Sequence, residues 1–423
     1  MNSIAFCKSI LKRYLPVNLK IRNHEPSFVE FVIIISLMMA ITSLSIDAMM
    51  PALPQIGSEL SIQNENDRQL IISIFFLGMA IGQLFFGPLS DKTGRKPTVY
   101  IGYVIYIIGS LLSVFTTSFL MMLTGRLLQG IGISAPRAVT LALVRDRYAG
   151  RMMARVMSFV MTVFILAPML APSLGQAIMR FSGWRGIFMG YIFIALVTLL
   201  WFSWRMPETL VPERRSPFSL RRIVDATFEI IKNRTALGYT VSAGLVGGAF
   251  LGYLNSAQQI FQEQYALGEL FPILFGIISI SIGMASFLNA RLVMRLGMRF
   301  LVQWSLRIIL SLAVVALVVS QITAGLPPLW FVMAYLMLTF FCIGLLFGNQ
   351  NALAMEPLGH LAGIGAAVVG SLSTLIQMPL GTLIGHNYNG TIFPLVIGIA
   401  VLTGISIFVV RWAESKTAVP SYT

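Results

Sequence analysis

The stretch Gly87-Pro-Leu-Ser-Asp-Lys-Thr-Gly-Arg-Lys96 lies between two long apolar runs. Its glycines permit a tight turn between two helices, because glycine adopts backbone conformations that other residues avoid. Its cations, Lys92, Arg95 and Lys96, are typical of a loop on the cytoplasmic side of a membrane. The stretch is therefore predicted to be a short cytoplasmic hairpin between two membrane helices, with one carboxylate, Asp91, among the cations.

The rest of the chain is made almost wholly of similar apolar runs. It has 423 residues, of which 57% are hydrophobic and 11% charged, whereas soluble domains carry roughly 25% charged residues. Runs of about 18 to 24 residues are long enough to cross about 30 Å of hydrocarbon as helices. They begin near residues 28, 69, 97, 120, 155, 185, 236, 271, 300, 327, 362 and 390. The sequence thus predicts an all-α membrane protein with twelve transmembrane helices.

The formal net charge of +14 is distributed unevenly over the predicted loops. Most Lys and Arg residues lie in tails and loops on the side of the N-terminus. Three lie on the opposite side (Arg68, Arg180 and Arg185) and three inside spans (Arg126, Arg137 and Arg307). This asymmetry predicts that both termini are cytoplasmic. It also accounts for the basic composition without a nucleic-acid partner.

The basic N-terminal tail lacks a cleavage site of small residues and is interpreted as retained, either solvated or lying on anionic lipid. Cysteine and histidine are too scattered to predict a disulfide or a metal site. These residues are Cys7, Cys342, His24, His360 and His386.

A segment rich in proline and cations divides the twelve runs into two sets of six. The predicted organisation is a tail (1–27), a six-helix bundle (28–206), a cytoplasmic linker (207–234), a second six-helix bundle (235–412) and a tail (413–423). A vestige of the first hairpin recurs at 290–299, where Gly297 and Arg299 take the places of Gly94 and Lys96. Met294 replaces Asp91. The recurrence predicts two repeated halves with a shared site between them.

Asp47 is the one acidic residue that lies clearly within a predicted span, near the outer end of the first. A charged side chain at the centre of a membrane helix costs roughly 2.5 to 3.5 kcal/mol, so Asp47 is expected to face the protein interior or a water-filled cavity. It either caps a helix end beside Pro51 or binds a proton.

Two arginines lie inside the fourth span. Arg126, in Gly125-Arg-Leu-Leu-Gln-Gly-Ile-Gly132, requires a helix carbonyl or a carboxylate as a partner unless it extends to the membrane surface. Arg137, eleven residues later, lines the inner part of a cavity or forms a structural pair; the sequence favours neither.

Four motifs together resemble the major facilitator superfamily, over about residues 28 to 412. The hairpin 87–96 follows its Gly-x-Leu-x-Asp-x-x-Gly-Arg-Lys loop, and 125–132 resembles its Arg-x-x-Gln-Gly signature. Ala167-Pro-Met-Leu-Ala-Pro-Ser-Leu-Gly175 resembles the Pro-x-x-Gly motif of its antiporters. The Ala-Pro pair there, and Asp-x-x-x-Pro-Ala-Leu-Pro from Asp47, are similar to the bicyclomycin and chloramphenicol resistance branch.

The resemblance implies a major facilitator fold and a drug:proton antiporter in a bacterial inner membrane, not an enzyme. It implies export of amphipathic small molecules, driven by the proton gradient without a cofactor, by a monomer in the lipid bilayer. The residues that it assigns are Asp47 and Arg126 for proton coupling or substrate, Gly87, Asp91, Gly94, Arg95 and Asp146 for a cytoplasmic gate, and Pro168, Pro172 and Gly175 for the antiporter motif. The last group is expected to pack the fifth span against the other half.

Other polar residues inside spans line the cavity or form interhelical hydrogen bonds, each worth on the order of 0.6 kcal/mol. The cavity candidates are Arg137, Asn255, Gln259 and Gln377. Export of a sugar, siderophore or metabolite is the alternative function, since nothing in the sequence identifies the substrate. A membrane enzyme or a channel is disfavoured, because the spans lack clustered His, Cys or carboxylates and a channel has no use for an antiporter motif.

Overall fold

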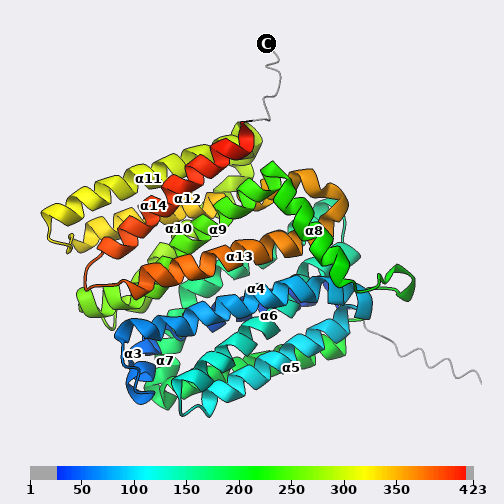
Figure 1. The fold of residues 1–423 in the computed structure, drawn as a ribbon. Coiled ribbons are helices and arrows are strands. Elements are labelled where there is room, and N and C mark those ends of the chain that lie inside the picture. Colours follow the sequence, from blue (N-terminus) through cyan, green and yellow to red (C-terminus); the bar gives the residue numbers. More distant parts are fainter. Residues whose placement is uncertain (1–25, 416–423) are drawn as a thin grey trace, which may run out of the picture.

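The computed structural model describes residues 26–415, and in this range the chain forms helices and turns without any strand (Figure 1). The predicted tails lie largely outside these residues, as do Cys7 and His24.

The first half contains four long helices and three short ones before the longest helix of the chain. These are α2 (Phe28–Asp47), η1 (Met50–Ala52), α3 (Leu53–Glu59), η2 (Glu65–Gln69), α4 (Leu70–Thr93), α5 (Arg95–Val114), α6 (Phe119–Arg147) and α7 (Gly150–Arg205). A connecting segment with η3 (Pro212–Arg214) and α8 (Leu220–Lys232) follows.

The second half repeats this plan. Its elements are α9 (Arg234–Gln258), η4 (Gln259–Gln264), α10 (Phe271–Leu296), α11 (Met298–Ile322), α12 (Leu329–Met355), η5 (Glu356–Leu361), α13 (Ala362–His386) and α14 (Phe393–Glu414). The turn η4 is π-helical and directly prolongs α9.

Eleven of the described helical segments are long and apolar enough to cross a membrane. One of them, α7, has 56 residues, which at 1.5 Å per residue would extend over about 80 Å. It is broken at Gly183, whose φ of 65° and ψ of −175° are not helical, and it therefore supplies two spans. The twelve-span, all-α prediction is confirmed.

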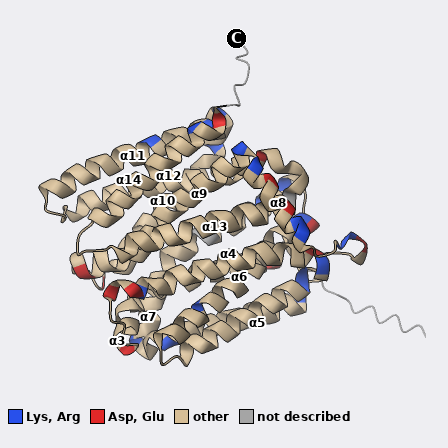
Figure 2. Ribbon diagram, viewed as in Figure 1, with Lys and Arg blue, Asp and Glu red and all other residues tan. Residues whose placement is uncertain are grey.

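The two ends of the bundle differ in charge. We call the end that carries α8 and the α4–α5 turn the α8 end, and the opposite one, with α3 and η2, the α3 end. Figure 2 shows Lys and Arg gathered mainly at the α8 end, whereas acidic residues are prominent at the α3 end. The predicted loop asymmetry is thus also an asymmetry in space.

Glycines let helices within each half approach closely. A Cβ at Gly78 of α4 would lie 2.2 Å from the carbonyl oxygen of Leu127, and a Cβ at Gly130 of α6 would lie 2.1 Å from that of Phe75. Membrane helices associate through such small residues because backbone contact replaces the hydrophobic driving force that lipid removes.

The halves meet along two pairs of helices. The helices α4 and α13 lie side by side (Figure 1), and the Ser371 hydroxyl donates to the carbonyl oxygen of Ala80 at 2.8 Å. The helices α7 and α10 form the other contact, where a Cβ at Gly276 would lie 3.0 Å from the carbonyl oxygen of Met169.

The recurrence seen in the sequence is present in the backbone. Gly94 (φ 106°, ψ 166°) separates α4 from α5, and Gly297 (φ 80°, ψ 155°) separates α10 from α11. Both lie in the positive-φ region that favours glycine. Arg299, one position further from its glycine than Arg95 is from Gly94, forms an ion pair with Glu356 after α12 at 2.6 Å, and Arg95 forms one with Asp146 near the end of α6. The two halves therefore share the hairpin and its charge pair.

We expect Gly130→Val to lower the unfolding free energy by about 1 to 3 kcal/mol, since overpacking a close contact forces the helices apart. The measurement is the thermal midpoint of the purified protein in detergent. Gly404→Val in α14 is the matched control, because a Cβ there meets no atom within 4 Å. Equal midpoints for the two variants would contradict the proposed close contact.

Candidate functional site

Arg126 is fully buried inside the first half. Its guanidinium donates to the carbonyl oxygens of Ile71 in α4 at 2.9 Å and Ser45 in α2 at 3.0 Å. It also donates to Gln129 Oε1 at 2.6 Å and lies over the Phe75 ring at 4.5 Å. The sequence left either a helix carbonyl or a carboxylate as the partner of Arg126, and the structure shows two helix carbonyls.

A hydrogen-bonded chain continues from Arg126 toward α5. Gln129 donates to the Ser113 hydroxyl at 3.1 Å, and the hydroxyls of Ser45 and Tyr106 lie 2.6 Å apart. Ser45 and Tyr106 were not among the residues predicted from the sequence, whereas Gln129 belongs to the same Arg-x-x-Gln-Gly signature as Arg126. The chain joins α2, α4, α5 and α6 around one buried positive charge.

Asp47 is the last residue of α2 and is only 5% exposed. Among residues 26–415 its carboxylate has no hydrogen bond or ion pair. Tyr191 and, from the second half, Tyr253 lie within electrostatic range of it. Both tyrosine hydroxyls are buried, with no hydrogen-bond partner in the described structure. Asp47 therefore lies where the halves meet, beside polar groups that the protein leaves unsatisfied.

Aromatic side chains of the second half surround Tyr253. Its ring lies 4.5 Å from that of Phe340 and stacks on that of Phe275 at 5.8 Å, centroid to centroid. Phe250 contacts Phe340 in turn, at 5.7 Å. An apolar wall of polarizable rings thus faces the region of the carboxylate.

The antiporter motif packs differently from the expectation. A Cβ at Gly175 would lie 1.6 Å from the carbonyl oxygen of Ala48, the neighbour of Asp47 in the same half. The contact with the other half is made six residues earlier in α7, between Met169 and Gly276. Gly175 therefore permits close contact between α7 and the residue that follows Asp47, and Met169 makes the contact with α10. The expectation that Gly175 itself faces the other half is not met, because α2 occupies that space.

Arg137 lies eleven residues after Arg126, close to three turns of α6, so both side chains project from one face. It is half-buried, and among the described residues it has no ion pair or hydrogen bond. The structure thus shows no structural partner for this cation.

The remaining cavity candidates lie in contacts between helices. Asn255 donates to the Ser73 hydroxyl at 3.0 Å, which joins α9 to α4 of the other half. Gln377 packs against α9, where a Cβ at Gly247 would meet its Oε1 at 2.5 Å. Gln259 belongs to a network at the α3 end.

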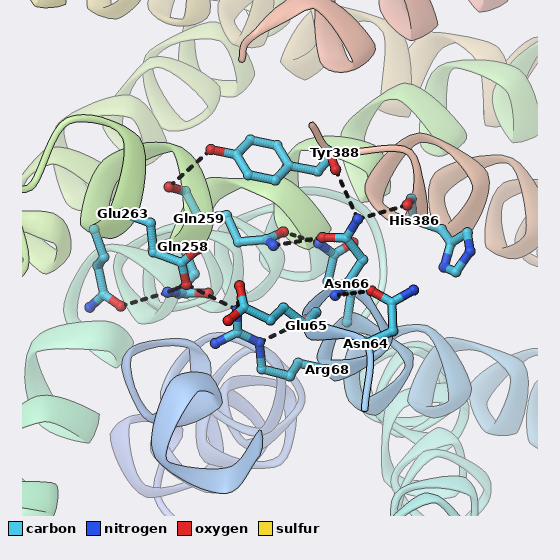
Figure 3. A network of polar contacts seen from close by, with 11 residues as sticks. Asn64, Glu65, Asn66, Arg68, Gln258, Gln259, Glu263, His386 and Tyr388 are labelled. Carbon is cyan, nitrogen blue, oxygen red and sulfur yellow. Dashed lines mark hydrogen bonds and ion pairs between the residues drawn. The ribbon is translucent and has the colours of Figure 1, made fainter. Parts of the chain in front are cut away.

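That network, which we call the α3-end network, ties η2 of the first half to α9, η4 and the end of α13. Figure 3 shows its side chains converging from the two halves. Arg68 forms an ion pair with Glu263 at 3.1 Å. Asn66 donates to the carbonyl oxygens of His386 at 2.9 Å and Tyr388 at 2.8 Å.

Glutamine side chains complete the α3-end network. Gln259 donates to Asn66 Oδ1 at 2.8 Å and accepts from the amide of Gln69. Burial raises the pKa of Tyr388, so its hydroxyl stays protonated and donates to the carbonyl oxygen of Gln259 at 3.4 Å. The halves are therefore joined by polar side chains at this end.

Gln259 is the one member of this network that was predicted from the sequence as a candidate site residue, and it was predicted to line the cavity. Two polar runs, Asn64-Glu-Asn-Asp-Arg-Gln69 and Gln258-Gln-Ile-Phe-Gln-Glu-Gln264, carry the signal in retrospect. Each run contains amide side chains, which both donate and accept hydrogen bonds, so the two runs are able to bond each other.

At the α8 end, the residues assigned to the gate surround Arg95. Its guanidinium donates to Asp91 Oδ1 at 2.7 Å, Asp146 Oδ2 at 3.0 Å and the Ser90 hydroxyl at 2.5 Å. The structure thus brings together Asp91, Arg95 and Asp146, as the sequence predicted. All three belong to the first half.

The connecting segment and α13 of the second half also reach this cluster. Glu208 accepts from the backbone N–H groups of Arg95 at 2.9 Å and Lys96 at 3.0 Å, which caps α5. A Cβ at Gly363, near the start of α13, would lie 3.9 Å from Asp91 Oδ2. A helix start favours negative charge, so Asp91 stabilises this contact between the halves. Gly87 lies beside Ala367 of the same helix.

The sequence model of the protein family described as the Major Facilitator Superfamily matches residues 35–381 of this chain. The chain belongs to the major facilitator superfamily. Members of this family are transporters, and this chain is therefore a multi-pass membrane transporter. Within the described residues no group of His, Cys, Asp or Glu side chains is arranged to hold a metal ion.

Several relatives span most of the chain. An uncharacterized MFS-type transporter, YdgK, of Bacillus subtilis is 29% identical over 347 residues, which are 81% of this chain and 85% of that protein. A bicyclomycin resistance protein homolog of Haemophilus influenzae is 25% identical over 93% of this chain and 98% of its own. A chloramphenicol resistance protein of Pseudomonas aeruginosa is 27% identical over 85% and 84%. The predicted resemblance to this branch is confirmed.

A solved structure shares the fold. The human organic anion transporter MFSD10 (TETRAN) aligns with a TM-score of 0.69 at 16% identity, over 92% of this chain and 100% of that one. The major facilitator fold predicted from the sequence is confirmed.

We expect Arg95→Gln to loosen the α4–α5 turn, because it leaves Asp91 and Asp146 without their shared donor. Removing one partner of a partly buried pair costs about 1 to 3 kcal/mol. Hydrogen exchange of backbone amides at the ends of α4 and α6 should accelerate about tenfold or more. Lys92→Gln, which removes an exposed cation of the same turn, should leave the exchange unchanged. Equal acceleration in both variants would contradict this arrangement.

Gln259→Ala should open the α3 end, because it removes the acceptor of Gln69 and the donor to Asn66. Spin labels at the exposed positions Gln63 and Asn387 report the distance between the halves by double electron–electron resonance. We expect the population with the longer distance to rise about fivefold or more, from the loss of two hydrogen bonds worth about 0.5 to 1.5 kcal/mol each.

The control for this experiment is Gln55→Ala. Gln55 donates to Glu59 within α3 at 3.1 Å and, among residues 26–415, forms no hydrogen bond to the second half. A distance distribution that moves equally with either substitution would show that the α3-end network does not hold the halves together.

Proposed function

We propose that this transporter exports amphipathic small molecules from a bacterial cell in exchange for protons, acting as a monomer in the inner membrane with both termini in the cytoplasm. The observation that carries the proposal is Asp47, a buried carboxylate at the meeting of the two halves that has no hydrogen-bond or ion-pair partner among the described residues. With this orientation, the α3 end faces outward and the α8 end faces the cytoplasm.

An unpaired carboxylate in a membrane interior is costly as an anion, and it is stabilised by a proton or by a cationic or hydrogen-bonding ligand. One group that binds either a proton or the substrate, but not both, suffices for exchange. Arg126 supports this role through the backbone, because it donates to the carbonyl oxygen of Ser45, two residues before Asp47. It thereby fixes the end of α2 and contributes positive charge.

The aromatic wall around Tyr253 favours an amphipathic substrate. Rings of Tyr and Phe attract organic cations through their faces and bury apolar groups. The free hydroxyls of Tyr191 and Tyr253 supply hydrogen bonds to a polar group of the same molecule. Relatives named for bicyclomycin and chloramphenicol resistance support antibacterial compounds as substrates.

Contacts on both sides of Asp47 support alternating access. The α3-end network joins the halves on one side, and Asp91 with α13 does so on the other. Two repeated bundles around a central site transport by rocking, with each end opening in turn. The membrane potential supplies about 2.3 kcal/mol per charge per 100 mV.

A second candidate is the export of an anionic metabolite or siderophore. It is favoured by Arg137, which lies on the same face of α6 as Arg126 and has no hydrogen-bond or ion-pair partner within the part of the chain that the structure describes. A carboxylate or phosphate of such a substrate would satisfy it.

The test begins with a growth-inhibition panel of amphipathic antibiotics in an efflux-deficient host. For any compound against which the chain protects, respiring everted vesicles should accumulate it, and its addition should dissipate an imposed proton gradient. Asp47→Asn should lower the rate of substrate-induced proton movement at least tenfold, because the amide does not take up a proton. Asp225→Asn, which changes an exposed carboxylate of α8, is the control.

Two results would overturn the proposal. Proton exchange at the normal rate in correctly inserted Asp47→Asn protein would remove Asp47 from coupling. Accumulation of the compound by energised right-side-out vesicles would identify an uptake symporter instead of an exporter. Protection against anionic compounds alone, lost in Arg137→Gln, would favour the second candidate.

A further inference from the structure

One face of α11, away from the meeting of the two halves, carries an unusual set of side chains. They surround a cavity of about 240 Å³ that opens to the outside of the bundle. Its lining residues are Trp304, Arg307, Ile308, Ser311, Leu312 and Val315. The helix is one of the predicted spans, so this cavity opens toward lipid.

Arg307 is the charged residue of this face. Its guanidinium lies over the Trp304 ring at 5.3 Å. Among the described residues it has no carboxylate or carbonyl partner. A guanidinium in contact with lipid is stable only with a partner or in reach of the membrane surface. The other arginine near the start of α11, Arg299, differs in this respect, because it pairs with Glu356 at 2.6 Å.

Two further donors lie on the same face. The indole N–H of Trp304 and the hydroxyl of Ser311 are both without a hydrogen-bond partner within residues 26–415. Three donors without an acceptor favour a ligand that is rich in acceptors and negatively charged. A phosphate diester has this chemistry, because its oxygens accept several charge-assisted hydrogen bonds.

The depth of the cavity matches a lipid head group. Arg307 lies nine residues after Met298, where α11 begins at the α8 end, or about 14 Å along the axis. Helical side chains point back toward the helix start, and a long arginine side chain extends to the membrane surface. Ile308, Leu312 and Val315 continue from Arg307 toward the middle of the membrane and form an apolar track.

We propose that this face of α11 binds one phospholipid of the leaflet at the α8 end. The phosphate accepts from Arg307 and Trp304, an ester carbonyl of the lipid accepts from Ser311, which lies four residues deeper in the span, and an acyl chain follows the apolar track. Phosphatidylglycerol is preferred to phosphatidylcholine, because its head group has no cation to oppose Arg307. The preference does not depend on which molecule the protein transports.

The test is native mass spectrometry of the delipidated full-length protein in a mild detergent. The added probes are phosphatidylglycerol, phosphatidylcholine with the same acyl chains, and inorganic phosphate. We expect one phosphatidylglycerol to bind about tenfold more tightly than phosphatidylcholine, and Arg307→Gln to remove this preference. Ser311→Val should weaken binding about threefold, by the loss of one hydrogen bond.

Arg291→Gln is the matched control. Arg291 of α10 also lies over an aromatic ring, that of Phe287 at 5.6 Å, but it is not among the residues that line the α11 cavity. If Arg307→Gln and Arg291→Gln lower the preference for phosphatidylglycerol equally, the preference comes from the general attraction of anionic lipid to a basic protein, and the proposal is wrong. So would binding without preference between the lipids, or competition by inorganic phosphate at the lipid's own concentration. If Arg307→Gln does not fold, Ile308→Trp, which fills the cavity, must weaken phosphatidylglycerol binding for the proposal to stand.

Discussion

The cost of a charge inside a bilayer is the constraint on which this structure depends. Each charged side chain that enters a span needs a partner, because hydrocarbon supplies none. Arg126 meets this need with carbonyls of α2 and α4, and the same bonds hold three helices of the first half together. Asp47, a short distance away, is left without a protein partner. A transporter needs such a gap, since a carboxylate that the protein satisfied would have no use for a proton or a ligand.

Close helix contact makes this arrangement possible. Gly78 and Gly130 bring α4 against α6, so that Arg126 reaches the carbonyl of Ile71. Gly175 brings α7 against the turn that follows Asp47. A side chain at any of these glycines would separate the helices that bury the charges. Packing and electrostatics are therefore parts of one design.

The sequence predicted the fold well, because span length, loop charge and a repeated hairpin are local signals. It also predicted that Asp91, Arg95 and Asp146 meet, since the family resemblance assigns the two hairpin residues and Asp146 to one cytoplasmic gate. It did not predict the α3-end network, because its members come from turns far apart in the chain and hydrogen-bond only after the halves have docked. Tyr191 and Tyr253 were not predicted as site residues either. A tyrosine in an apolar run indicates a binding site only when the structure shows that its buried hydroxyl has no hydrogen-bond partner among the described residues, as here.

The two ends of the transporter hold the halves together in different ways. At the α3 end the bonds join side chains of the two halves directly, through Asn66 and Gln259. At the α8 end the strong ion pairs stay within the first half, and the second half meets them through the start of α13. Each hydrogen bond adds only about 0.5 to 1.5 kcal/mol, so a few of them match the about 2.3 kcal/mol that one charge gains from 100 mV. Contacts of this strength keep one end closed and still yield to the gradient, whereas a large apolar contact between the halves at either end would trap the protein in one state.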